Sequence, residues 1–233
     1  MSILDAFNYY FEMVAVDSEE LKQEVYKLRY QVYCLEKDFE NPEQHTDGLE
    51  YDEYDEHSCH YLIRHRATDS YMATTRLILP NRYPFPIEAN SQIDTKLVKN
   101  INRANLAELS RFCVSKQFRR RATERDLITT NDTDESRSPR GKHSSASITL
   151  SLFACAVQMS SDHNILYWYA IMEPALKRVF SAMGIYFVEV GPLVDYHGMR
   201  VPCVIKVTDL LNSIAEKDID YWAMVTNNGQ ILI

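Results

Sequence analysis

Apolar residues recur at helical spacing between Asp17 and Glu36. Five aliphatic side chains in this segment stand three or four positions apart, which predicts a helix with one apolar face. These side chains are Leu21, Val25, Leu28, Val32 and Leu35. Asp17, with Glu20 three residues later, has the form of a capping box, so we expect the helix to begin there.

Short and alternating apolar runs predict the strands of a sheet. Residues 106–114 alternate between two faces, and residues 58–66 and 71–79 form two strand-like runs joined by a polar turn, which predicts a hairpin. This order predicts a mixed α/β fold with neighbouring antiparallel strands. Further strands are expected at 165–172, 185–190 and 201–207, and further helices at 147–159 and 173–183.

A long polar stretch interrupts this pattern. Residues 129–147 include no aromatic side chain and no aliphatic side chain larger than alanine, so they cannot bury enough surface to order themselves. A length of 233 residues suits one large domain. We therefore predict a single domain over residues 1–233 with a mobile polar insertion at about 122–147.

The composition is that of an ordinary soluble protein, with 45% hydrophobic and 25% charged residues. A net charge of −8 argues against a protein that binds nucleic acid through bulk electrostatics. Ten carboxylates and one lysine between Glu36 and Glu56 set the sign of this charge. For residues 36–50 we expect a solvated acidic face.

Cysteine usage and hydropathy indicate a cytoplasmic protein. The five cysteines are widely spaced, which is typical of a reducing compartment and predicts neither a disulfide framework nor a thiol-rich zinc site. The first ten residues lack the pattern of a secretory signal, and the apolar stretch 148–159 is too short to span a bilayer. His57, Cys59 and His60 have no fourth ligand nearby, so we expect no metal site.

Several charged residues lie inside or beside otherwise apolar elements. Buried charges are costly unless they are paired, so we expect these residues to meet in space. From spacing alone, a structural ion-pair network behind the sheet and a functional cluster both remain open. The residues are Arg29, Asp52, Asp55, Arg76, Glu108 and Arg111.

Two sets of motifs resemble known acyltransferases. The first half of the chain resembles the acyl-homoserine-lactone autoinducer synthases, a branch of the GNAT acyltransferase fold. Its motifs are Arg29-x-x-Val32-Tyr33, Asp52-x-x-Asp55, Thr75-Arg76-Leu77 and Glu108-Leu109-Ser110-Arg111-Phe112. The second half resembles the PEP-CTERM/exosortase system-associated acyltransferases, which are similar to N-acyl amino acid synthases. Its motifs are Phe118-Arg119-Arg120-Arg121, Glu173-Pro174-Ala175-Leu176, Gly184-Ile185, Gly191-Pro192 and Tyr196-His197-Gly198-Met199-Arg200-Val201-Pro202.

The resemblance implies a GNAT-like α/β domain whose mixed, mostly antiparallel central sheet is splayed near its middle and carries helices on both faces. It implies an N-acyltransferase that moves an acyl chain from an acyl carrier protein or coenzyme A thioester to the amine of an amino acid or similar small molecule. Beyond that thioester co-substrate it implies no bound cofactor. Glu108 is then the general base, which removes a proton from an amine whose pKa is near 8. The residues around the acceptor are then Arg29, Asp52, Asp55, Arg76 and Arg111.

Glu108 and Arg111 stand three residues apart, so an unbroken strand would point them to opposite faces. Either a β-bulge intervenes, as is typical of GNAT proteins, or Arg111 acts behind the sheet as a structural partner. A bulge would free backbone N–H groups that can bind the thioester oxygen.

The donor is expected to bind beyond the same strand. GNAT proteins hold the donor's diphosphate on a glycine-rich turn, and this chain has three arginines there instead. Arginines suit the phosphopantetheine of an acidic carrier protein, so we expect acyl carrier protein as a partner; a solvated basic patch is the alternative. The expected donor-binding residues are Phe112, Val114, Phe118, Arg119, Arg120 and Arg121. We expect the acyl chain in an apolar channel lined by Phe112, Phe153 and residues 165–172.

The remaining motifs leave alternatives open. Phe180 occupies the position at which GNAT proteins often carry an acidic tyrosine, and we assign no general acid because a thiolate of pKa near 8.5 can leave unaided. Tyr196 and His197 either contact the acceptor or, with Gly198, form a turn between strands, which we favour. Two other functions stay open: a homoserine-lactone synthase that uses S-adenosylmethionine, and a non-catalytic module that binds acyl ligands or a protein partner.

Overall fold

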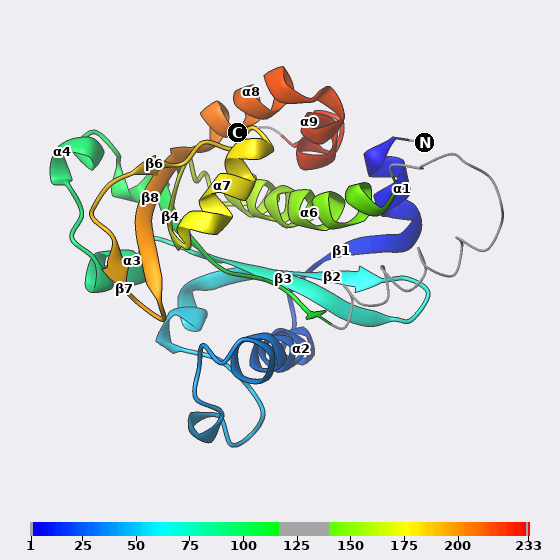
Figure 1. The fold of residues 1–233 in the computed structure, drawn as a ribbon, viewed down its shortest axis with the longest axis horizontal. Coiled ribbons are helices and arrows are strands. Elements are labelled where there is room, and N and C mark those ends of the chain that lie inside the picture. Colours follow the sequence, from blue (N-terminus) through cyan, green and yellow to red (C-terminus); the bar gives the residue numbers. More distant parts are fainter. Residues whose placement is uncertain (1, 117–139, 232) are drawn as a thin grey trace.

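A mixed sheet forms the centre of the protein (Figure 1). The computed structural model describes residues 2–116, 140–231 and 233. Across the described sheet the strand order is β1-β2-β3-β4-β5-β8-β6, with β7 paired to β8. The strands are β1 (Phe11–Ala15), β2 (Ser58–His65), β3 (Ser70–Ile78), β4 (Leu106–Val114), β5 (Tyr167–Met172), β6 (Val188–Glu189), β7 (Val194–Asp195) and β8 (Met199–Lys206).

Helices cover both faces of this sheet. Figure 1 shows α6 and α7 with the C-terminal helices on one face and α2 on the other. The α-helices are α1 (Ile3–Tyr10), α2 (Glu19–Tyr30), α3 (Pro86–Asn90), α4 (Thr95–Val98), α6 (Arg140–Asp162), α7 (Pro174–Ala182), α8 (Val207–Lys217) and α9 (Ile219–Thr226). A π-helix, η1 (Gln31–Glu36), continues α2, and 3₁₀ turns lie at η2 (Pro42–Gln44), η3 (Glu53–His57) and η4 (Arg103–Asn105). None of the helices in the described ranges is long and apolar enough to cross a membrane.

The central strands separate after a short parallel pairing. β4 and β5 are parallel, whereas every other pair in the described sheet is antiparallel. Their register runs only from Leu106 opposite Tyr167 to Glu108 opposite Tyr169. Within the described strands, the remaining residues of β4 have no partner on β5, so the sheet splays at Glu108. The predicted mixed, mostly antiparallel sheet, its splay and its two helical layers are confirmed.

A β-bulge interrupts β4 just beyond this point. On β3, Arg76 pairs with Ser110 and Thr74 pairs with Cys113, so Thr75 alone faces both Arg111 and Phe112. Arg111 has a φ of 48°, the left-handed value that a bulge residue adopts. The bulge returns Arg111 to the face that carries Glu108 and Ser110, which settles the two alternatives left open by their spacing in favour of the bulge.

The helical layer above the splay is held by a dense apolar core. α6 is the central helix of this layer, and its residues Ile148 to Val157 are buried apart from Thr149. Trp168 on β5 is fully buried and donates its indole N–H to Ser160 on α6 at 2.7 Å. Because a buried indole N–H needs a partner, this contact fixes α6 over β5.

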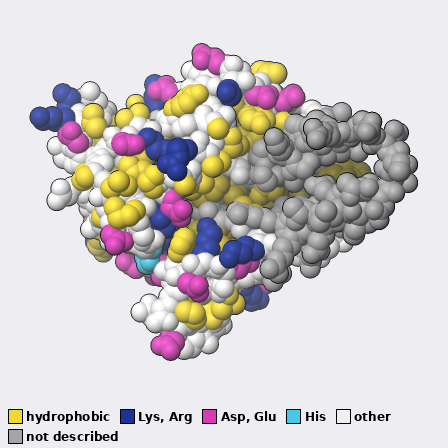
Figure 2. Space-filling view, viewed as in Figure 1, with side chains coloured by type: hydrophobic (Ala, Val, Ile, Leu, Met, Phe, Trp, Pro, Cys, Tyr) yellow, Lys and Arg dark blue, Asp and Glu magenta, His cyan; other side chains and the backbone are white. Residues whose placement is uncertain are grey.

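The edge of the sheet at β6 presents apolar side chains to solvent. Tyr186, Val188 and Leu193 are each more than half exposed. Figure 2 shows hydrophobic side chains mixed with charged ones over this part of the molecule. β6 is only two residues long, which limits the strand edge open to pairing.

Most expected elements are present, with shifted ends. α2 begins after Ser18, whose hydroxyl accepts from the backbone N–H of Leu21. The N-cap is therefore Ser18 rather than Asp17, and the predicted capping box of Asp17 and Glu20 is wrong. The helix predicted from Ser147 begins at Arg140, and residues 140–147 form its first turns rather than part of an irregular insertion. Residues 122–139 of the predicted insertion lie outside the described residues.

Candidate active site

Three arginines and three carboxylates form a closed ring of ion pairs below the splay. Within the ring each arginine bridges two carboxylates, and each carboxylate bridges two arginines. Arg111 also lies 3.5 Å from Glu40, outside the ring. The order around the ring is Arg29, Asp55, Arg76, Asp52, Arg111, Glu50 and back to Arg29. The ring therefore contains all five predicted cluster residues together with Glu50.

The geometry of the ring is that of charge-assisted hydrogen bonds. Arg29 donates to Asp55 at 2.7 Å, and Arg76 donates to Asp55 at 2.9 Å and to Asp52 at 2.6 Å. Arg111 donates to Asp52 at 3.2 Å and to Glu50 at 2.7 Å. The three positive and three negative charges balance, which makes their burial tolerable.

Local structure places the carboxylates of the ring. Asp52 caps η3 by accepting from the N–H of Tyr54, while Asp55 accepts from the N–H of Asp52, which is a reciprocal capping box. Burial alone would raise the pKa of Glu50, but Arg29 and Arg111 lower it to about 2. The pKa of Asp55 is likewise held well below its ordinary value by Arg29 and Arg76, against the effect of burial. Glu50 and Asp55 are therefore ionised and held by the arginines of the ring.

Glu108 lies beside this ring and differs from it electrostatically. Its side chain is 1% exposed, and among the described residues it has no ion-pair partner. Burial raises the pKa of Glu108 to about 8, although a backbone hydrogen bond from Ile87 and the nearby Arg76 act in the opposite direction. A carboxyl group with this pKa exchanges protons readily near neutral pH.

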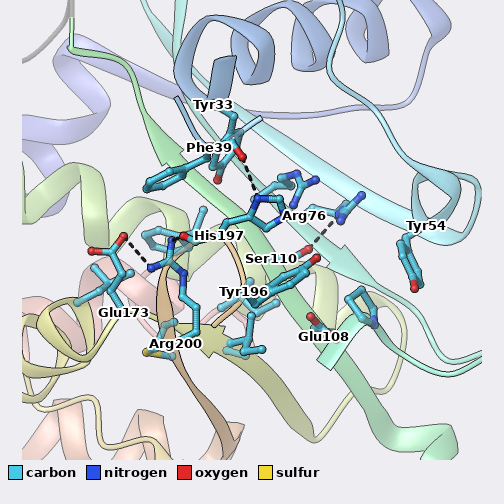
Figure 3. Close-up of a pocket in the computed structure, with 18 of the residues that line it drawn as sticks. Tyr33, Phe39, Tyr54, Arg76, Glu108, Ser110, Glu173, Tyr196, His197 and Arg200 are labelled. Carbon is cyan, nitrogen blue, oxygen red and sulfur yellow. Dashed lines mark hydrogen bonds and ion pairs between the residues drawn. The ribbon is translucent and has the colours of Figure 1, made fainter. Parts of the chain in front are cut away.

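A cavity of about 170 Å³ opens at the splay between β4 and β5. One side of it is polar, and Figure 3 shows side chains from β3, β4 and the β7–β8 turn converging there. This polar half includes Asp52, Tyr54, Arg76, Glu108, Ser110 and Tyr196. The other half is apolar and includes Phe112, Met172, Leu176, Phe180 and Phe187. The two halves meet at the β4 bulge, where the polar Arg111 and the apolar Phe112 both line the cavity.

Two tyrosines face Glu108 across the polar half of the cavity. Tyr196 extends from the β7–β8 turn over Ser110 and Glu108, and Tyr54 approaches from η3 (Figure 3). Burial raises the pKa of both phenols, and the proximity of Glu108 adds to this. Both hydroxyl groups therefore remain protonated near neutral pH and can donate hydrogen bonds to a ligand.

The β7–β8 turn also forms part of the cavity wall. His197 and Gly198 have φ values of 52° and 94°, which is the tight turn that we favoured from the sequence. His197 Nδ1 donates to the carbonyl oxygen of Phe39 at 2.8 Å, and the Arg200 guanidinium lies 5.2 Å from the centre of the Phe39 ring. Because His197 and Arg200 also line the cavity, the turn is part of the candidate site as well.

The predicted donor-binding residues are only partly described. Phe112 lines the apolar half of the cavity, whereas Val114 packs against the core and is not among the lining residues. Phe118 and the three arginines Arg119, Arg120 and Arg121 lie outside the described residues. The apolar half of the cavity lies where we expected the acyl channel, with Phe112 in its wall, whereas Phe153 lies behind Phe112 and is not among the lining residues.

Sequence reasoning missed one residue of the ring. Glu50 belongs to the segment expected to be a solvated face, yet it is 1% exposed and binds both Arg29 and Arg111. The expectation is wrong for Glu50 because two guanidinium groups compensate its burial. The only signal in the sequence is its position two residues before Asp52, beside Leu49.

Comparisons with known proteins fit this geometry. Residues 28–129 match the family described as an acetyltransferase (GNAT) domain. The chain matches no curated protein.

Several solved structures have a similar fold. TofI, solved in a ternary complex with an inhibitor and MTA, has a TM-score of 0.60 and 18% identity over 88% of this chain and 96% of its own. FeeM, an N-acyl amino acid synthase from uncultured soil microbes, has a TM-score of 0.58 and 13% identity over 87% and 94%. BjaI, a CoA-dependent acyl-homoserine lactone synthase solved with SAM and isopentyl-CoA, has a TM-score of 0.58 and 16% identity over 97% of both chains.

Identities this low establish a shared fold rather than a shared substrate. The matched domain covers β2, β3 and β4, which contain the hairpin, the bulge and Glu108. Together with the splayed sheet, these comparisons show that the protein has the GNAT acyltransferase fold.

Proposed function

We propose that the protein is an N-acyltransferase that moves an acyl chain from a thioester to the amine of an amino acid or similar small molecule. The observation that carries this proposal is the buried Glu108 carboxyl group, which has a pKa of about 8 and lines the cavity where β4 and β5 separate. An apolar half that can hold the acyl chain adjoins the polar half that contains Glu108 and can hold the amine.

Glu108 acts as the general base in the proposed reaction. An amino acid's α-ammonium group has a pKa near 8 and must lose a proton before it can attack. Glu108 takes this proton directly or through one water molecule. The neutral amine then adds to the thioester carbonyl, and the C–S bond breaks as the nitrogen loses its second proton, which neutralises the departing thiolate. Glu108 passes the first proton to solvent.

The β4 bulge provides stabilisation for the tetrahedral intermediate. A bulge leaves backbone N–H groups outside the regular strand ladder, and the bulge at Arg111 and Phe112 lies at the edge of the cavity. Such groups stabilise the negative oxygen that forms when the amine adds. Phe180 lies nearby without an acidic group, so the thiolate leaves without a side-chain acid at that position.

For the donor, we favour acyl carrier protein over coenzyme A. The basis is the sequence Arg119-Arg120-Arg121, which stands where a glycine-rich turn would otherwise hold a diphosphate. Carrier proteins are acidic, and arginine clusters attract them. The name of BjaI describes a CoA-dependent enzyme, so coenzyme A is the alternative donor.

For the acceptor, we favour an amino acid, in keeping with FeeM and with the motifs of the second half of the chain. An acyl-homoserine-lactone synthase that uses S-adenosylmethionine is the second candidate. It is supported by the similar fold of BjaI, which was solved with SAM. Asp52 is the carboxylate of the ring that lines the cavity, and it suits either acceptor because both carry an ammonium group.

Mass spectrometry of extracts from expressing cells and from their medium, covering both water-soluble and lipid fractions, tests the proposal. Cells with the wild-type protein should accumulate an N-acyl amino acid that is absent from cells with the Glu108→Gln variant. An acyl lactone in its place would select the second candidate. Identical extracts from wild-type and variant cells, with both proteins soluble, would contradict an acyltransferase that depends on Glu108.

A further inference from the structure

We propose that the donor's acyl group is short, on the order of six carbons or fewer, and that Phe180 sets this limit. This inference rests on the proposed acyltransferase function and specifies its substrate class. It follows from the aromatic side chains that bound the apolar half of the cavity and from the volume of the cavity.

Phe112, Phe180 and Phe187 form an aromatic wall in the apolar half of the cavity, and Phe153 packs behind it. The Phe180 ring lies edge-on to Phe112, with ring centres 5.7 Å apart, and edge-on to Phe153 at 4.9 Å. Phe187 lies 6.2 Å from Phe180 on its other side. Phe180 thus contacts every other member of the wall.

The wall is backed by solid core. Phe153 is fully buried behind the cavity, and the ring of Trp168 stacks on the ring of Phe153 with their centres 6.3 Å apart. Phe180 and Phe187 are 3% and 4% exposed. Protein interiors of this kind are close-packed, so an acyl chain that reaches Phe180 can extend further only by displacing a ring.

The size of the cavity leads to the same limit. An apolar cavity of about 150 Å³ in a protein core holds one benzene molecule, which has six carbons. The cavity here is about 170 Å³ and includes the polar half. A long acyl chain therefore does not fit beside an acceptor amine.

Phe180 is the residue of the wall that can change this limit. Phe112 is part of the β4 bulge, so its replacement would also disturb the reacting centre. Phe180 instead lies in the last turn of α7, outside the β4 bulge. Its truncation would open the cavity onto Phe153 and Phe187.

Binding of S-acyl-pantetheines tests this inference. Pantetheine is the part shared by coenzyme A and the carrier-protein arm, so the test does not depend on which donor is used. Calorimetry with straight chains of two to fourteen carbons gives the dissociation constant at each length. For the wild type we expect affinity to rise roughly fourfold per methylene, from about 0.8 kcal/mol each, and to stop rising near six carbons.

The variants move this limit. Phe180→Ala should extend the rise by two or more carbons, and Phe180→Leu should extend it less while disturbing the core less. Phe7→Ala is the matched control, because Phe7 is equally buried in α1 and does not line the cavity. We expect Phe7→Ala to leave the limit where it is in the wild type.

The outcomes separate this inference from the proposed function. A wild-type affinity that still rises at twelve or fourteen carbons would overturn the length limit alone. An unchanged limit in both Phe180 variants, with the proteins folded, would overturn the role of Phe180. Failure of every acyl length to bind would instead count against the acyltransferase function itself.

Discussion

The backbone N–H of Ile87 donates a hydrogen bond of 2.9 Å to Oε2 of Glu108. Ile87 is fully buried near the start of α3, which follows the segment of prolines after β3. This bond holds one carboxyl oxygen while Glu108 still lines the cavity. One hydrogen bond offsets only part of the cost of burying a carboxylate, and the raised pKa is the result.

Glu108→Gln should abolish most activity without unfolding the protein. Glutamine keeps the shape of the side chain and an oxygen that accepts from Ile87, but it cannot take a proton. We expect kcat to fall by about 100-fold or more, which is the usual contribution of a positioned base. Steady-state kinetics measures this, and thermal unfolding should give a Tm no lower than that of the wild type. A soluble variant with near-normal turnover would remove Glu108 from the mechanism.

The rate should rise with pH as Glu108 loses its proton. Because its pKa is about 8, most of the base is protonated at pH 7, and kcat/KM should approach its plateau only above pH 8. The acceptor amine titrates in the same range. The residual activity of Glu108→Gln reports the amine alone, so its pH profile should be less steep than that of the wild type. Parallel profiles would assign the titration to the amine.

Stability should fall as pH rises above 6.5. The pKa of Glu108 is about 8 in the folded protein and 4.5 as its ordinary value, so between these values the folded state holds a proton that the unfolded state has lost. The free energy of unfolding then falls with rising pH. Burial, with Arg29 nearby, lowers the pKa of His60 from 6.5 to about 3, which gives the opposite slope below pH 6.5.

Above pH 6.5 His60 no longer changes the free energy of unfolding, because its side chain is neutral in both the folded and the unfolded state. Of these two groups, only Glu108 contributes to the slope in that range. Denaturant unfolding should show the wild type losing about 2 kcal/mol between pH 6.5 and 8, while Glu108→Gln stays nearly level over that range. Equal slopes for the two proteins would show that Glu108 is not protonated in the folded state.

The fold was largely predictable because periodicity reports which side chains are buried. The hairpin of β2 and β3 and the alternating strand β4 were found at the observed positions within one residue. The ends of the elements were less predictable. Asp17 and Ser18 are both good N-cap residues for α2, and the backbone conformation, which the sequence does not show, selects Ser18. The strand predicted at residues 185–190 has only two residues in the structure, Val188 and Glu189, because only these two pair with β8. Apolar side chains alone do not make a strand.

The candidate site was predictable only in part, because it depends on contacts between distant residues. The spacing of Glu108 and Arg111 left two geometries open, and the pairing of β4 with β3 decides between them. The burial of Glu50 depends on Arg29 and Arg111, which are 21 and 61 residues away. Tyr196, which faces Glu108, lies in a turn whose position relative to β4 is set by β8 and β5.

The salt dependence of KM should distinguish an acyl carrier protein donor from coenzyme A. If Arg119, Arg120 and Arg121 attract an acidic carrier protein, acyl carrier protein thioesters should give a lower KM than the matching acyl-coenzyme A. This advantage should shrink as salt is added, because exposed charges are screened beyond about 8 Å at physiological ionic strength.

Charge reversal at the three arginines tests the same point. It should raise the carrier-protein KM and leave kcat nearly unchanged. The control reverses Lys96 and Lys99, two exposed lysines at α4, and should have little effect. Equal use of both donors at every salt concentration would contradict the role of the arginines.

Glu50→Gln should be among the most destabilising single substitutions in the chain. It removes one negative charge from the ring and leaves Arg29 and Arg111 with one carboxylate fewer, and breaking a buried pair in this way costs about 3–5 kcal/mol. Glu53→Gln is the matched control, since Glu53 belongs to the same acidic segment but is exposed, and it should stay within about 0.5 kcal/mol of the wild type.

The pH dependence of the free energy of unfolding shows whether Glu50 stabilises the protein through its charge or through packing. Its pKa is about 2 in the folded protein and 4.5 as its ordinary value, so its contribution is complete above pH 4.5 and is lost as pH falls toward 2. Denaturant unfolding from pH 7 down to pH 3 should therefore show the difference between wild type and Glu50→Gln narrowing in acid. A difference that stays constant over this range would mean that Glu50 stabilises the protein through packing, and that the ring does not depend on its charge.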